Sequence, residues 1–151
     1  MDQWKNADEI LDFAIKNEEE AAALYTGLAA KSEKPWMKTV FEGFAKEEEG
    51  HKAKLVAVKK GQKLQHAEKQ IMDLKIGDYL IDVEPSPNLD YQDALIIAMK
   101  AEKAAFKLYS DIAKQATDPD IRSLFQLLAQ EEAKHKLRFE VEYDEFVLKN
   151  N

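Results

Sequence analysis

Cysteine is absent from the 151 residues of the chain, which excludes disulfide bonds, thiol catalysis, iron–sulfur clusters and cysteine-ligated zinc. No apolar run approaches the roughly 18 residues that a membrane span requires. Basic residues are in the minority, with 22 lysines and arginines against 29 aspartates and glutamates and a net charge of −7. This balance argues against nucleic acid or an anionic membrane as the main partner, because both need a basic face. The N-terminal residues also lack the form of a signal peptide, so we expect a soluble cytoplasmic protein.

Proline and glycine are also scarce, and the four prolines, at positions 35, 85, 87 and 119, mark the breaks between long uninterrupted segments. Within these segments apolar residues recur every three or four positions, which is the spacing of one face of a helix. The four stripes comprise Leu11, Ala14, Ala21, Tyr25 and Leu28; Met37, Phe41, Phe44, Leu55 and Val58; Leu95, Ala98, Ala105, Tyr109 and Ile112; and Ile121, Phe125, Leu128 and Phe139. Strand-type alternation is almost absent, so the pattern predicts an all-α protein of four helices.

The connections between the four segments differ in length. Short joins around Pro35 and Pro119 predict two antiparallel hairpins, at about residues 5–60 and about residues 91–148. The connection between the hairpins, about residues 61–90, is too apolar for a free linker. We therefore predict a single domain over residues 1–151, a four-helix bundle of two hairpins whose long crossover packs along the bundle.

The two hairpins repeat one another in sequence. When the chain is shifted by 84 residues, residues 10–55 align with residues 94–139 without a gap, and 15 of the 46 positions are identical. The identical pairs include Glu18 with Glu102, Glu48 with Glu132, and His51 with His135. Shared packing explains repeated apolar positions, but it gives no reason to repeat glutamates and histidines on the same stripes.

Helical phase decides which residues of the run "EEEGH" lie inside. The apolar stripe of the second segment passes through positions 48 and 51, so we expect Glu48 and His51 to point into the core. Glu47 and Glu49 are expected to point away from it. The same test places four further polar residues on inner stripes: Glu18, Glu102, Glu132 and His135.

Four carboxylates and two imidazoles in one small core are costly unless cations lie among them, because an isolated buried ion costs several kcal/mol and like charges repel. Lysine and arginine are almost absent from the stripes, so metal ions are a simpler solution than a buried polar network. Two divalent ions would neutralise four glutamates while the histidines bind uncharged. One Glu from each of two helices and a Glu-x-x-His from each of the other two is the ligand set of di-iron and di-manganese bundles. The predicted ligands are Glu18, Glu48, His51, Glu102, Glu132 and His135.

At these residues the chain resembles the rubrerythrin family of the ferritin-like superfamily, over about its whole length. The resemblance is carried by "NEEEAAALY", "EEEGH", "AEKAAFKLY" and "EEAKH", together with the connection "DLKIGDYL". It implies a ferritin-like bundle that binds two iron ions, with manganese or zinc as substitutes, and an oxidoreductase that reduces hydrogen peroxide or dioxygen in oxidative-stress defence. It also implies roles for the ligands: Glu18 and Glu102 as single-helix carboxylates, Glu48 and Glu132 as carboxylates that include the bridges, and His51 and His135 as ligands of one iron each.

Two departures from the family pattern bear on function. Full-length rubrerythrins add a cysteine-ligated rubredoxin domain, which this chain lacks, so we expect electrons from an external donor protein or from ferrous iron. They also carry an extra glutamate one turn after the third-helix ligand, where this chain has Ala105. The resulting symmetric site is closer to that of bacterioferritin, which leaves a ferroxidase or iron-storage role open. A non-catalytic metal-binding bundle is a second alternative.

Tyr25 and Tyr109 follow Glu18 and Glu102 by seven residues, about two helical turns. They either contact a ligand carboxylate or supply an electron, or they simply pack in the core. No fifth helix of the kind found in ferritin cages is expected after the fourth segment. We therefore predict a homodimer rather than a cage.

Overall fold

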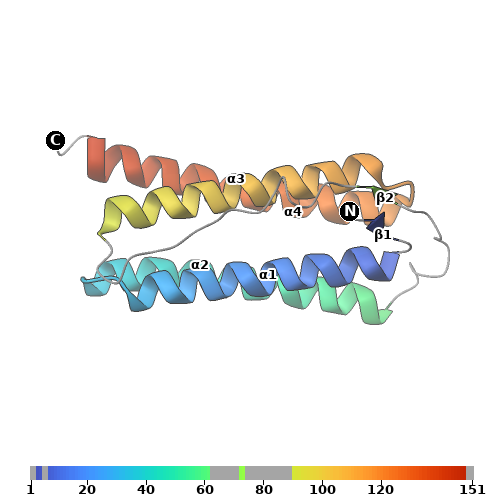
Figure 1. The fold of residues 1–151 in the computed structure, drawn as a ribbon, viewed down its shortest axis with the longest axis horizontal. Coiled ribbons are helices and arrows are strands. Elements are labelled where there is room, and N and C mark those ends of the chain that lie inside the picture. Colours follow the sequence, from blue (N-terminus) through green and yellow to red (C-terminus); the bar gives the residue numbers. More distant parts are fainter. Residues whose placement is uncertain (1–2, 5–6, 62–71, 74–89, 149–151) are drawn as a thin grey trace.

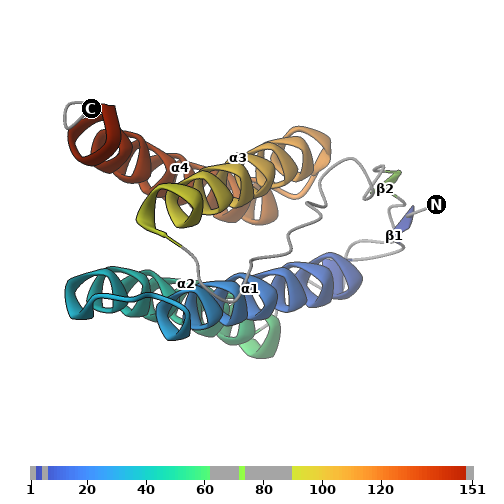
Figure 2. The same ribbon diagram turned by 60° about the vertical axis from the view of Figure 1, so that its left-hand side comes forward.

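The structure is a computed structural model that describes residues 3–4, 7–61, 72–73 and 90–148. Four long helices make up most of it: α1 (Ala7–Ala30), α2 (Pro35–Gly61), α3 (Tyr91–Gln115) and α4 (Pro119–Tyr143). A short π-helix, η3 (Asp144–Leu148), continues α4. Figures 1 and 2 show that α1 lies beside α2 and that α3 lies beside α4. The predicted fold class, an all-α ferritin-like bundle of two antiparallel hairpins, is confirmed.

Short polar side chains and prolines set the starts of the helices. The side chain of Asp118 accepts hydrogen bonds from the backbone N–H groups of Asp120 and Ile121, at 2.8 and 3.3 Å. Pro119 occupies the first turn of α4, where its missing N–H costs no hydrogen bond. Asp90 caps α3 in the same way through the backbone N–H of Asp93. None of the helices in the described ranges is long and apolar enough to cross a membrane.

The core consists of two apolar halves, each built from both hairpins. One half joins the start of α1 and the end of α2 to the end of α3 and the start of α4, and includes Leu11, Leu55, Ile112, Phe125 and Leu128. The other half lies at the opposite ends of the same helices, and includes Leu28, Phe41, Phe44, Leu95 and Phe139. Both halves contain residues of the predicted stripes. The six predicted ligands lie between them in sequence on their helices and are all buried.

A short strand pair is the element that periodicity missed. β1 (Gln3–Trp4) pairs antiparallel with β2 (Met72–Asp73), so that Gln3 lies opposite Asp73 and Trp4 lies opposite Met72. A strand of two residues is too short to show any alternation. Apart from residues 61, 72, 73 and 90, the predicted crossover lies outside the described residues, so its packing along the bundle stays a prediction, as do the predicted domain limits.

Candidate metal centre

Each of the four helices contributes to one buried polar layer. Glu18 comes from α1, Glu48 and His51 from α2, Glu102 from α3, and Glu132 and His135 from α4. The four glutamates are 0–1% exposed, although carboxylates are rarely buried so fully unless they are paired. The structure thus brings together all six side chains that helical phase placed inside. Their role as metal ligands stays a prediction.

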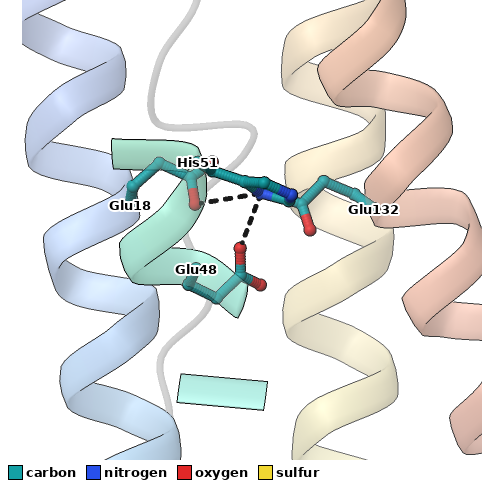
Figure 3. A group of neighbouring side chains, drawn as sticks. All are labelled: Glu18, Glu48, His51 and Glu132. Carbon is teal, nitrogen blue, oxygen red and sulfur yellow. Dashed lines mark ion pairs between the residues drawn. The ribbon is translucent and has the colours of Figure 1, made fainter. Parts of the chain in front are cut away.

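The first half of the layer centres on His51. Its Nδ1 lies 3.0 Å from Oε1 of Glu48, 3.4 Å from Oε2 of Glu132 and 3.5 Å from Oε1 of Glu18. Figure 3 shows Glu18 and Glu132 reaching this ring from opposite hairpins. Ligand atoms of these four residues all lie within 4.8 Å of one another, which is close enough for one metal ion to contact them all.

The second half centres on His135. Its Nδ1 lies 3.3 Å from a carboxylate oxygen of Glu102, 3.3 Å from one of Glu132 and 3.4 Å from one of Glu48. These four residues also offer ligand atoms within 4.8 Å of one another. We call the two groups the His51 position and the His135 position. Glu48 and Glu132 belong to both positions, so they are the carboxylates that could bridge two bound ions.

The pKa values of the carboxylates show how strongly this layer resists negative charge. Burial raises the pKa of Glu48 to about 8, and the charges of Glu102 and Glu18 act in the same direction, against hydrogen bonds from the two histidines. Burial, with the charge of Glu102, also raises the pKa of Glu132 well above its usual range. For Glu18, burial is outweighed by contacts that include His51 and Tyr109, so its pKa is lowered.

The pKa values of the two histidines are also raised, but here burial opposes the shift. Burial alone would lower the pKa of His51, but its contacts with Glu132, Glu18 and Glu48 raise it to about 12. The pKa of His135 is raised for the same reason, by Glu102, Glu132 and Glu48. Without metal, protons therefore serve as the cations of the layer.

Tyr25 and Tyr109 tie the two hairpins together across this layer. The hydroxyl of Tyr109, on α3, donates to Oε2 of Glu18 on α1 at 2.6 Å. The hydroxyl of Tyr25, on α1, donates to Oε2 of Glu102 on α3. Each tyrosine thus contacts a predicted ligand carboxylate of the opposite hairpin and also packs in the core. The sequence left contact with a carboxylate and core packing as alternatives, and the structure shows both. A role in electron transfer stays a prediction.

One contact to the layer was not expected from helical phase. Glu47 has a 43% exposed side chain, as its outward position predicts, but its Oε1 lies 2.6 Å from Nε2 of His135. The other carboxylate oxygen, Oε2, accepts a hydrogen bond from Arg138 at 3.1 Å. Glu49 is exposed, as predicted. The outward position predicted for Glu47 is thus confirmed, but its side chain still reaches back to His135, a contact that the sequence did not indicate.

The layer fits a pair of metal ions because several of its buried atoms lack other partners. Apart from their contacts with one another in the layer, Oε1 of Glu18, Glu48, Glu102 and Glu132 and Nδ1 of His51 have no hydrogen-bond partner among the described residues. Oxygen and imidazole nitrogen donors suit iron, manganese and zinc. The tyrosines occupy the opposite oxygens of Glu18 and Glu102, so the unpartnered oxygens remain for an ion.

Removing a tyrosine hydroxyl tests how far these contacts orient the ligands. Tyr25→Phe and Tyr109→Phe keep the ring but leave a buried carboxylate oxygen without its donor. We expect each to lower metal affinity by roughly 10–100-fold, the usual cost of losing a partner of a ligand. Chelator competition measures this, with Tyr143→Phe as the control, because Tyr143 packs at the end of the core. Wild-type affinity in both variants would contradict the assignment.

The raised pKa values predict how stability depends on pH. The folded metal-free protein binds more protons than the unfolded chain, for Glu48 between 4.5 and about 8 and for His51 between 6.5 and about 12. Its free energy of unfolding should therefore fall as pH rises from about 5 to about 9. The lowered pKa of Glu18 acts oppositely, but only below its ordinary value of 4.5.

Bound metal should reverse the dependence of the free energy of unfolding on pH, because metal ions compete with protons for the ligands. The stabilisation that added metal gives is expected to grow over the same pH range. Urea unfolding of metal-free and metal-loaded protein across this range measures both trends. A metal-free protein whose stability is constant from about pH 5 to 9 would contradict this uptake of protons on folding.

Comparison with known proteins agrees with this geometry. A solved structure of a hypothetical protein from Pyrococcus furiosus has the same fold, with a TM-score of 0.62 and 26% sequence identity over 91% of this chain and 87% of that chain. The family model named Rubrerythrin matches residues 9–143, which include all four long helices except the two residues at the start of α1. The chain therefore belongs to the rubrerythrin family.

Proposed function

We propose that the protein is a di-iron oxidoreductase of the rubrerythrin type that reduces hydrogen peroxide or dioxygen. The observation that carries this proposal is the overlap of the His51 and His135 positions in Glu48 and Glu132. Two sites that share two carboxylates suit a pair of ions that act on one small molecule. Two ferrous ions, when bound, would supply the two electrons that reduce one peroxide to water.

The residues of the layer would hold the ions and keep water away from them. The two apolar halves of the core enclose the layer, and the four ligand glutamates are at most 1% exposed. Tyr25 and Tyr109 fix the orientation of Glu102 and Glu18 from across the bundle. Such burial favours a small oxidant with two oxygen atoms over a large organic substrate.

Electrons have to reach the centre from elsewhere, because the chain has no cysteine for an iron–sulfur site of its own. We propose that a separate electron-donor protein reduces the ions, or that ferrous iron itself is the reductant. The homodimer and the cytoplasmic location stay predictions.

Metal analysis of variants tests the ligand assignment. We expect two ions per chain in the wild type and fewer in Glu48→Ala, which removes one of the two carboxylates common to both positions. Glu49→Ala is the matched control, because this neighbour on α2 is exposed. Elemental analysis after removal of loosely bound metal measures the stoichiometry. If Glu49→Ala loses as much metal as Glu48→Ala, the assignment of Glu48 fails.

The choice of oxidant depends on Ala105, which lies on α3 one turn after Glu102. The resemblance to rubrerythrins implies that a glutamate at this position would replace a histidine as a ligand of one iron during oxidation. Without that carboxylate, His51 and His135 should both remain ligands in both redox states. We therefore expect dioxygen and peroxide to oxidise the diferrous protein at comparable rates.

Rapid mixing of the anaerobic diferrous protein with each oxidant, followed by ferric absorbance, measures these rates. A strong preference for peroxide would contradict the expectation. Ala105→Glu, which restores the family's residue, is expected to shift the preference towards peroxide. Continued uptake of ferrous iron far beyond two ions per chain would instead indicate iron storage.

A further inference from the structure

His135 is held from outside the layer by three residues, which are linked to it and to one another by four contacts. Glu47 approaches its Nε2 at 2.6 Å, and Arg138 donates to the other oxygen of Glu47 at 3.1 Å. The guanidinium carbon of Arg138 lies 4.4 Å from the ring centroid of Phe44. That ring in turn meets the His135 ring edge-on, with centroids 5.0 Å apart. We call these three residues, Glu47, Arg138 and Phe44, the His135 clamp.

The clamp determines how His135 presents its nitrogens. When Nε2 carries the proton and donates it to Glu47, the lone pair of Nδ1 faces the carboxylates of the layer. Arg138 restricts Glu47 in turn, because its planar guanidinium both hydrogen-bonds the carboxylate and lies over Phe44. Arg138 is 56% exposed, so this ion pair adds little stability and its effect is mainly orientation.

The sequence repeat does not reproduce this clamp around His51. The 84-residue shift that relates His51 to His135 relates Lys54 to Arg138 and Leu128 to Phe44. A leucine offers no ring to a cation, and a lysine lacks the planar fork that binds a carboxylate and an aromatic face together. The surroundings of His51 therefore lack two of the groups from which a clamp could be built.

The remaining counterpart, Glu131, has a different partner. Within the described residues its ion pair is with Lys134, one turn along the same helix, at 3.6 Å. The carboxylate contacts of His51 in those ranges all use Nδ1. The side chain of His51 is also more exposed than that of His135, 9% against 1%.

We propose that the clamp makes the two metal positions unequal: the His135 position retains its ion, and the His51 position exchanges its ion with solution first. The proposal rests on the binding of two metal ions proposed above. Glu47 acts in it as a positioning residue, because its carboxylate touches the ligand and not the ion. The near-symmetric ligand set by itself would give two equivalent positions.

Release of ferrous iron to a coloured chelator tests the proposal. Wild-type protein loaded anaerobically with two ferrous ions is expected to lose them in two phases of one equivalent each. Crystals treated until one equivalent has left should show the remaining iron by anomalous scattering at the His135 position. Neither readout depends on catalytic activity.

Variants identify the clamp as the cause. Glu47→Ala should accelerate the slow phase by roughly 10–100-fold and leave the fast phase unchanged. Glu47→Gln, whose amide oxygen can still accept from Nε2, should lie close to the wild type. Glu131→Ala is the matched control from the other hairpin and should change neither phase. Arg138→Lys should give an intermediate acceleration, since it keeps the charge but loses the planar group.

Three results would overturn the proposal: release of both ions in a single phase, retention of iron at the His51 position, or equal effects of Glu47→Ala and Glu131→Ala. These results leave the binding of two ions intact, so they concern the inequality alone. Failure of the wild-type protein to bind iron at all would instead overturn the proposed function. Urea unfolding of each variant distinguishes a local effect from general destabilisation.

Discussion

The burial of four carboxylates and two imidazoles in one layer is the constraint on which this molecule depends. Each isolated buried ion costs several kcal/mol, whereas a whole domain is stable by only about 5–15 kcal/mol. The layer is therefore compatible with the fold only when cations are present in it. Without metal, protons fulfil this role, as the raised pKa values of Glu48 and His51 show. Metal ions would balance the same negative charge while the carboxylates stay deprotonated.

The rest of the bundle can be understood as the support of this layer. Each apolar half of the core draws residues from all four helices, so both hairpins must meet before the six side chains come together. The tyrosines add direct hydrogen bonds between hairpins, from Tyr25 to Glu102 and from Tyr109 to Glu18. A ligand set built by repetition thus becomes one site only through contacts that cross between the repeats.

Periodicity predicted the helices and the six inner polar residues, because both follow from local sequence spacing. It placed Glu47 correctly on the outward side but did not indicate its contact with His135, since helical phase fixes the direction of Cβ but not the reach of a long side chain. The partners of Glu47, His135 and Arg138, lie 88 and 91 residues away along the chain, and no pattern on α2 indicates them. The two repeats do differ in sequence near this contact: the positions that correspond to Phe44 and Arg138 in the other repeat hold Leu128 and Lys54. The pairing of β1 with β2 was missed because two residues show no period.

Anomalous diffraction from crystals of the iron-loaded protein would show whether the polar layer holds a pair of ions. We expect two iron ions in this layer, both in contact with Glu48 and Glu132, one of them beside Glu18 and His51 and the other beside Glu102 and His135. A layer without iron, or iron bound only by exposed carboxylates such as Glu19 or Glu49, would contradict it.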